Sequence, residues 1–275
     1  MRLSPARLWA AALALALAGQ AGCSGHSGGA RLVVVGSTSV QPFIELLAEE
    51  YSATASLTID VQGGGSSAGI QAVRAGAADL GMSSRPLAPG EAGLVAVPIA
   101  RDALALVVHP SNPVRDLDRE QIRALFSGAV PDWSKVGGTD RRVTLIIREE
   151  GSGTRSAFED LIMQGVRNSP RALVQDSNGS VRETVAQDPA AIGYISLGLV
   201  NQRVRPLRVD GVEPRPETVR DGTYPLSRAF LLVYRPPLSP PAQAFLDFVL
   251  SPEGQALLAS EGLLPVAPAR EVGRR

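Results

Sequence analysis

The sequence predicts an α/β protein built from open, mostly parallel sheets that are flanked by helices. Two observations predict this class. Short apolar runs of strand length alternate along the chain with longer runs in which apolar residues recur at helical spacing. In addition, loops rich in glycine, serine and threonine follow several of the expected strands, at the sheet edge where open α/β sheets bind ligands.

The first half of the chain predicts two strand–helix units followed by two more strands. Residues 32–35 form a continuous apolar run, as in a strand that is buried on both faces. Apolar residues between positions 43 and 51 then fall on one helical face. The expected elements are a strand at 32–35, a helix at 43–51, a strand at 57–61, a helix at 70–76, and strands at 79–82 and 103–108.

The second half predicts a similar alternation from residue 110 onward. Asp118 is placed to cap a helix whose apolar face carries Ile122, Leu125 and Phe126. Residues 205–220 are rich in proline and arginine and predict irregular surface chain. The other expected elements are strands at 143–147, 191–195 and 229–234, a helix at 154–163, and a helical region at 242–259 that Ser251 and Pro252 interrupt.

The composition gives no sign of a nucleic-acid-binding or metal-binding protein. Lysine and arginine total 27, and so do aspartate and glutamate, so the net charge of zero offers no bulk attraction to a polyanion. Histidine, cysteine and carboxylate residues show no clustered ligand spacing, and we expect neither a metal nor a cofactor. With 44% hydrophobic residues, the chain can bury the core of one or two domains.

The N-terminus predicts export from the cytoplasm. Residues 1–22 are expected to be a signal peptide, in which two arginines precede an apolar run too short to span a bilayer. Cys23, the only cysteine, follows where a bacterial lipoprotein signal carries its lipidated cysteine. Gln20 stands where such signals usually have an aliphatic residue, so an ordinary secretory signal is the alternative. Residues 23–30 predict a flexible tether, and we expect the mature protein in the periplasm or at the cell surface.

Three loops of small and hydroxyl residues carry the expected chemistry, at residues 36–39, 63–69 and 148–155. Each opens a run with helical spacing, and a helix N-terminus has unpaired N–H groups and a partial positive charge. Small residues let an anion approach that backbone, and hydroxyls add donors. One such loop is an ordinary cap. Three of them, one with an arginine, predict a cage for a dehydrated tetrahedral anion.

The order and spacing of these loops resemble the phosphate-binding proteins of bacterial high-affinity phosphate ABC transporters. The similar segments are 36–42, 63–70, 79–87, 126–138 around Trp133, 148–155, 191–194 and 251–255. The resemblance implies a two-lobed, periplasmic-binding-protein-like fold of the second class, with the ligand in the cleft. Residues 31–108 plus 225–275 would form the first lobe and residues 109–224 the second, with a hinge where the chain crosses between them.

The same resemblance implies a function without chemistry. The protein would be a monomer that captures inorganic phosphate and delivers it to an ABC permease and its ATPase. Phosphate stripped of water must regain its hydrogen bonds, which backbone N–H groups, hydroxyls and an arginine fork can supply. By motif, the expected contacts are Thr38, Ser39 and the backbone of Val40 in the first loop, Ser66 in the second, and Arg148, Ser152, Gly153 and Thr154 in the third.

Ser84 marks the main departure from this family. The best-known members have an aspartate there, which accepts the proton of bound phosphate and repels sulfate, an anion without a proton at neutral pH. This chain has Ser84 and Arg85 instead, and we hypothesise that Glu149 is the proton acceptor. Arg85 either contacts the anion or joins the two lobes by a salt bridge. Selectivity against sulfate, molybdate or a related oxyanion therefore stays open.

Two alternatives come from other classes of protein. Residues 65–69 match the Gly-x-Ser-x-Gly pattern of a nucleophile elbow between a strand and a helix, which would suit a serine hydrolase. Such an enzyme needs a histidine base within reach. The two histidines of the chain are His26 in the tether and His109 near the expected hinge, which disfavours this alternative. The other alternative is an exported sensor with the same fold.

Overall fold

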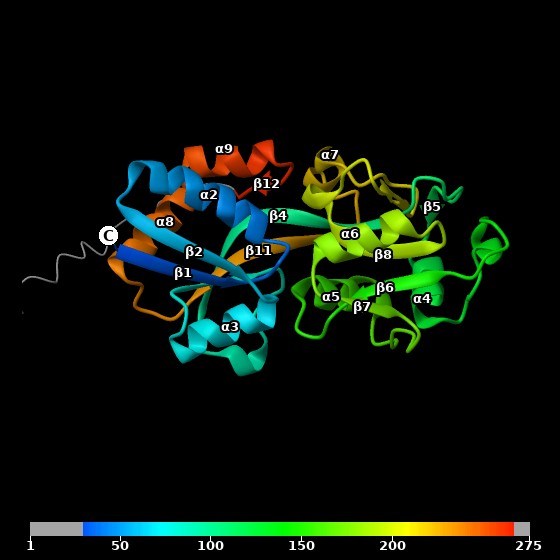
Figure 1. Cartoon of the computed structure of the whole chain (residues 1–275), viewed down its shortest axis with the longest axis horizontal. Helices are drawn as coiled ribbons and strands as arrows, with labels where there is room; N and C mark the ends of the chain where they lie inside the picture. Colours follow the sequence, from blue (N-terminus) through cyan, green and yellow to red (C-terminus); the bar gives the residue numbers. More distant parts are fainter. Residues whose placement is uncertain (1–29, 267–275) are drawn as a thin grey trace, which may run out of the picture.

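One long strand, β4 (Val95–Val108), runs through both halves of the molecule. Up to Ala103 it pairs with β11 (Ser227–Tyr234), and from Leu104 onward it pairs with β8 (Ala191–Ser196). Figure 1 shows two lobes side by side, with β4 and the chain that leads into β11 running between them. The predicted α/β fold with two lobes is confirmed, and the sheets of the two lobes share β4.

The computed structural model describes residues 30–266. The expected signal peptide at residues 1–22, the expected lipidation site Cys23 and the tether up to residue 29 lie outside the described residues. Within 30–266, no helix combines the length and the apolar character that crossing a membrane requires.

A mixed sheet with helices on both faces forms the first lobe. Besides β4 and β11, its elements are β1 (Ala30–Gly36), α2 (Gln41–Thr54), β2 (Leu57–Gly63), α3 (Ser66–Ala75), β3 (Leu80–Ser83), η1 (Pro89–Glu91), α8 (Pro240–Leu250), α9 (Pro252–Ser260) and β12 (Leu264–Pro265). The sheet order is β2-β1-β3-β11-β4, in which the first three strands are parallel and β11 is antiparallel to both neighbours. Helices α2, α8 and α9 pack on one face and α3 on the other (Figure 1).

The second lobe repeats this arrangement with a smaller sheet. Its elements are β5 (Asp116–Leu117), α4 (Arg119–Ser127), η2 (Trp133–Val136), β6 (Thr144–Arg148), α5 (Gly153–Phe158), η3 (Glu159–Met163), β7 (Leu173–Gln175), α6 (Asn178–Gln187), η4 (Leu197–Leu199), β9 (Arg205–Pro206), β10 (Arg208–Val209) and α7 (Pro216–Arg220). The sheet continues from β4 through β8 and β6 to β7, and the last three strands are parallel. Helix α6 covers one face, and α4 and α5 cover the other.

Residues 104–108 of β4 alternate between two hydrophobic clusters, because successive side chains of a strand point to opposite faces. Leu104 and Leu106 pack in the cluster on the α4 and α5 side. Ala105 and Val107 pack in the cluster on the α6 side, together with Val181. Both faces of the strand are covered, which explains why its sequence is continuously apolar rather than alternating.

The position at which β4 changes its pairing partner indicates where the chain crosses from the first lobe to the second. Residues 104–108 pair with β8 and pack in the clusters of the second lobe. We therefore propose that the first crossing lies between Ala103 and Leu104, a few residues before the predicted boundary at 108–109. The predicted second crossing near residues 224–228 stays a prediction. It is supported by the backbone N–H of Leu104, which donates to the carbonyl of Leu226 at 2.8 Å.

One sequence-based expectation about local structure needs correction, and another is confirmed with a difference in detail. Residues 205–220 are not irregular surface chain, because they form β9, β10 and α7 and bury Leu207, Val209 and Val219. Leu207 and Val209 lie two residues apart, which is the spacing of one strand face, and the surrounding prolines and arginines hide this short pattern. The helix expected at 154–163 is α5 followed by one π-helical turn, η3.

Candidate functional site

Three strands of the first lobe end at the same edge of its sheet. Because β1, β2 and β3 are parallel, the loops that follow them lie together, and those after β1 and β2 lead into α2 and α3. Gly36 ends β1 with a φ of 146°, and a Cβ there would collide with the carbonyl oxygen of Met82 in β3. Glycine therefore lets the chain turn away from the sheet without separating the first loop from the end of β3.

Serines from these three loops form a buried hydroxyl cluster. Ser37 Oγ donates to Ser84 Oγ at 3.0 Å, and Ser84 N–H donates to Ser66 Oγ at the same distance. The hydroxyls of Ser66 and Ser84 also lie 3.4 Å apart. None of the three residues is more than 2% exposed. Water does not reach these hydroxyls, so they satisfy their hydrogen-bonding capacity with one another.

The third loop, residues 148–155, belongs to the second lobe and contacts this cluster directly. Ser39 Oγ and Thr154 Oγ1 lie 2.6 Å apart, and the N–H of Ser67 donates to the carbonyl of Gly151 at 3.1 Å. A Cβ at Gly153 would collide with Ser66 Oγ and would lie 2.6 Å from Ser84 Oγ. The backbone of the third loop therefore reaches the serine cluster only because residue 153 is glycine.

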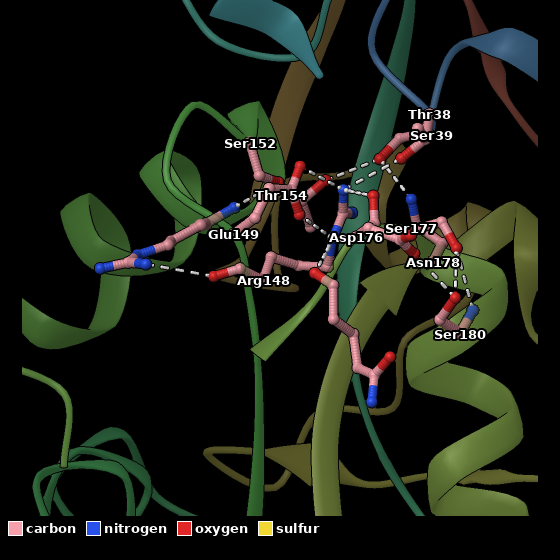
Figure 2. A network of polar contacts seen from close by, with 12 residues as sticks. Thr38, Ser39, Arg148, Glu149, Ser152, Thr154, Asp176, Ser177, Asn178 and Ser180 are labelled. Carbon is pink, nitrogen blue, oxygen red and sulfur yellow. Dashed lines mark hydrogen bonds and ion pairs between the residues drawn. The ribbon is translucent and has the colours of Figure 1, made fainter. Parts of the chain in front are cut away.

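Arg148 is the buried cation of this region. It ends β6 and is 1% exposed. Its Nη2 donates to Thr38 Oγ1 and to the carbonyl of Asp176, both at 3.0 Å (Figure 2). Its Nη1 is buried and has no hydrogen-bond partner. An unpaired buried donor costs about 1–3 kcal/mol, and more on a charged group, so this nitrogen marks where an acceptor would be stabilised.

Glu149 holds the same guanidinium on its other side. Its two carboxylate oxygens accept from Arg148 Nε at 2.8 Å and from Arg148 Nη2 at 2.9 Å. The pair cancels in net charge, so an anion at this point would be held by oriented donors rather than by excess positive charge. The expected role of Glu149 as a proton acceptor stays a prediction. Glu150 points elsewhere, with a side chain 93% exposed.

Tyr194 fixes the backbone of Arg148 through a hydrogen bond. The backbone N–H of Arg148 donates to the hydroxyl of Tyr194 at 3.2 Å, and the ring of Tyr194 stacks on Phe158 with centroids 4.1 Å apart. Burial raises the pKa of the Tyr194 phenol, so the hydroxyl stays protonated across the physiological range. This packing fixes the end of β6 from which Arg148 projects.

Arg85 makes its ion pair within the first lobe. Its guanidinium bonds both oxygens of Glu91, at 2.7 and 2.9 Å, and donates to Ser67 Oγ at 3.1 Å. These hydrogen bonds hold the pKa of Glu91 below its ordinary value. Arg85 therefore does not join the two lobes by a salt bridge. Its expected contact with an anion stays a prediction, and the geometry gives its donors other partners.

Two further expected contacts serve the local fold in this structure. The backbone N–H of Val40 donates to the carbonyl of Ser37 at 3.0 Å and so closes the turn that leads into α2. Ser152 is 2% exposed, and its hydroxyl caps α5 by accepting from the N–H of Arg155 at 3.3 Å. A buried cap at this position aims the N-terminus of α5 at the region between the lobes.

Sequence reasoning missed two residues of this site, Ser37 and Asn178. Asn178 is 1% exposed and donates from Nδ2 to Ser39 Oγ at 2.9 Å, as Figure 2 shows. It begins α6, a helix that was also missed, directly after its cap Ser177. Residues 177–180 read Ser-Asn-Gly-Ser, so they form a fourth loop of small and hydroxyl residues. Its composition matches that of the other three loops, although the strand before it has only three residues.

The arrangement needed for a serine hydrolase is not formed by the described residues. The hydroxyl of the central serine of the Gly-x-Ser-x-Gly pattern, Ser67, accepts from Arg85, and none of its hydrogen bonds in the described residues goes to a histidine base. His109 bonds the hydroxyl of Ser111 at 2.7 Å, and His26 lies outside the described residues. Within 30–266, no group of three or more His, Cys, Asp or Glu side chains is placed to hold a metal ion.

Comparison with known proteins gives consistent matches along most of the chain. A family model described as PBP superfamily domain matches residues 24–253. The phosphate-binding protein PstS of Bacillus subtilis is 30% identical over 243 residues, which cover 86% of this chain and 80% of the relative.

Two solved structures extend these matches to the fold. One is a Clostridium perfringens substrate-binding protein with bound phosphate, assigned to a phosphate ABC transporter. It is 38% identical, has a TM-score of 0.84, and is matched over 86% of this chain and 100% of its own. The other, an ABC-type phosphate transport receptor from Vibrio cholerae, is 34% identical with a TM-score of 0.73 and the same coverage.

Proposed function

Because the chain belongs to the PBP superfamily and, within it, to the family of the phosphate-binding protein PstS, we propose that it captures inorganic phosphate and delivers it to an ABC permease and its ATPase. The relatives carry this function in their names. We further propose that the protein performs no chemistry of its own, in keeping with those names and with the partners of Ser67 and His109.

The observation that carries the proposal is the environment of Arg148. A guanidinium that is 1% exposed keeps one nitrogen without a partner. The Thr38 hydroxyl of the first loop bonds this guanidinium, and Ser39 beside it bonds Thr154 of the third loop. A phosphate oxygen accepting from Nη1 would remove the cost of that buried donor. The hydroxyls that bond to one another could each redirect a proton to the remaining oxygens. The set of donors fits an anion rich in acceptors.

The proposed binding motion follows from where these donors lie. Thr38, Ser39, Ser66 and Ser84 belong to the first lobe, while Arg148 and Thr154 belong to the second. An anion that bonds to both sets binds more tightly when the lobes are together than when they are apart. This difference in affinity is what stabilises the closed arrangement. We therefore propose that phosphate closes the lobes and that the closed protein is the form presented to the permease.

The proposal includes the location of the protein. Export through the signal peptide at residues 1–22, with anchoring through Cys23, would place the monomeric binding lobes outside the cytoplasm, beside the permease. These residues lie outside the described part of the chain, so this step depends on the sequence alone. Metabolic labelling with a fatty acid, compared between the native chain and Cys23→Ala, tests the anchor directly.

Phosphate uptake by the host bacterium tests the proposed function as a whole. Cells without the gene should lose uptake of radiolabelled phosphate at low external concentration, and the native gene should restore it. A gene encoding Arg148→Ala should not restore uptake although the protein is exported in equal amount. A gene encoding Arg171→Ala, a change at an exposed arginine, is the matched control and should restore it. Uptake that does not depend on the gene would overturn the proposal.

A further inference from the structure

Asn178 joins α6 of the second lobe to the first loop through one end of its amide, and bonds β8 of its own lobe through the other. Its Nδ2 donates to Ser39 Oγ in the first loop at 2.9 Å, and its Oδ1 accepts from the backbone N–H of Ser196 at 3.1 Å. A backbone N–H can only donate, so the atom facing Ser196 must be the oxygen. The amide orientation is therefore fixed, and the NH2 group of Asn178 must face Ser39 (Figure 2).

This orientation restricts what the Ser39 hydroxyl can do. A serine hydroxyl has one proton and two acceptor lone pairs. The NH2 group of Asn178 offers no acceptor, so Ser39 receives a hydrogen bond there and keeps its own proton for another partner. In this structure the other near partner is Thr154 Oγ1, at 2.6 Å. Asn178 thus holds Ser39 as a hydroxyl whose proton is directed into the region between the lobes.

A buried ion pair holds Asn178 from the opposite side. The hydroxyl of Ser196 donates to Asp102 Oδ1 at 2.8 Å, and Asp102 Oδ2 accepts from Arg228 Nε and Nη2 at 3.0 and 2.9 Å. Asp102 is 3% exposed and Arg228 8%. The two residues are register partners on β4 and β11, beside the place where β4 changes partners. The hydrogen-bond chain therefore runs from the crossing strands to Ser39.

We propose that Asn178 is a positioning residue for anion binding, which sets the Ser39 hydroxyl as a donor when the lobes are together. The inference rests on the proposed function, since it concerns the same phosphate site. Asn178 itself need not touch the anion. It acts through Ser39, and it can do so only while α6 of the second lobe lies against the first loop, so the donor is set by closure itself.

An aspartate at this position separates a positioning role from a structural one. Asn178→Asp keeps the shape, and a carboxylate at the first turn of a helix favours the helix. The ionised carboxylate cannot donate, so Ser39 would turn its proton toward it. The protonated carboxyl can donate again. Burial raises the pKa of a carboxyl, whereas the helix N-terminus and the N–H of Ser196 lower it, so the titration is followed down to acidic pH. The donor role should therefore return as the pH falls.

The experiment is calorimetric titration of phosphate into the anion-free native protein, Asn178→Asp, Asn178→Ala and Asn112→Ala between about pH 8 and about pH 4.5. Asn112 is the matched control because it is 3% exposed and bonded through Oδ1 to the N–H of Val114, away from the site. Each Kd is divided by the native Kd at the same pH, which cancels the ionisation of phosphate. The charged groups on the elements around Asn178 are Arg148, Glu149, Asp176, Arg182, Asp102 and Arg228, and the division removes their effect on the native site.

We expect both Asn178 variants to bind phosphate about 10- to 100-fold more weakly than the native chain at about pH 8. The defect of Asn178→Asp should shrink as the pH falls, while that of Asn178→Ala stays constant. Asn112→Ala should keep the native Kd whatever its effect on thermal stability. Native-like binding by both Asn178 variants, or an aspartate defect that does not change with pH, would overturn the inference. Absence of phosphate binding by the native chain would instead overturn the proposed function.

Discussion

The hydroxyls of Ser39 and Thr154 lie 2.6 Å apart although 115 residues separate them along the chain. Ser39 follows a strand of the first lobe, and Thr154 lies in the first turn of a helix of the second. Their contact is one of several between donors of the two lobes, and Arg148 bonding Thr38 is another. In the proposed function these donors turn toward a shared anion, and the predictions below change them one at a time.

Arg148→Ala should weaken phosphate binding by at least about 100-fold, because it removes the buried guanidinium and leaves Glu149 without its partner. Arg171→Ala, at an exposed arginine, should change the Kd by less than about twofold. Titration calorimetry on both variants measures the difference. Equal effects in the two variants would contradict the assignment of Arg148 to the site.

Gly153→Ala should raise the phosphate Kd clearly while it changes the thermal midpoint little. The new methyl group would collide with Ser66 Oγ and so keep the third loop away from the serine cluster, whereas each lobe could still fold. Gly90→Ala is the matched control, because a Cβ there meets nothing within 4 Å. Phosphate Kd and thermal midpoint should be measured together. A lower midpoint with an unchanged Kd would show that the close approach at Gly153 does not serve binding.

Glu149→Gln tests whether Glu149 accepts the hydrogen bond from the proton of bound phosphate. If the carboxylate accepts that proton, its neutral amide should reduce the preference for phosphate over sulfate by about tenfold or more. The measurement is the ratio of the Kd for sulfate to the Kd for phosphate. The substitution also disturbs the ion pair of Glu149 with Arg148, but this changes both Kd values alike and leaves the ratio unchanged. A ratio equal to that of the native chain would rule out Glu149 as the acceptor.

Glu91→Gln should alter the response of stability to acid. Arg85 holds the pKa of Glu91 below its ordinary value, so the pair stabilises the fold above the unfolded pKa, and that contribution is lost as the pH falls through the folded one. The variant should therefore unfold at a lower temperature than the native chain at about pH 7, and the gap should shrink as the pH falls below about 4.3, the ordinary pKa of glutamate. A gap of constant size would mean that the ion pair is not its source.

The sequence predicts most of the site because its loops have a simple chemical signature. Glycine and hydroxyl residues between a strand and a helix place Ser39, Ser66 and Thr154 at strand ends, and the structure brings them together. Asn178 carries the same signature but follows β7, a strand of three residues too short to be recognised. Helix α6 buries only Val181 and Val185 among its apolar residues, which gives a weak periodic pattern.

Partner changes and long-range bonds are what the sequence could not predict. Nothing in the apolar run of β4 indicates that its pairing passes from β11 to β8 after Ala103, because both partners demand the same residue types. The pairing of Arg85 with Glu91 depends on how the chain after β3 folds back. The sequence offers several carboxylates to that arginine without ranking them.

The most direct test of the central claim is titration calorimetry of the anion-free protein with phosphate and then with sulfate. The account predicts tight binding of one phosphate per chain, which sulfate does not match, and which Arg148→Ala loses. That result would also show that discrimination persists with Ser84 in place of an aspartate. Binding of sulfate alone, or of neither anion, would contradict the assignment of phosphate as the ligand.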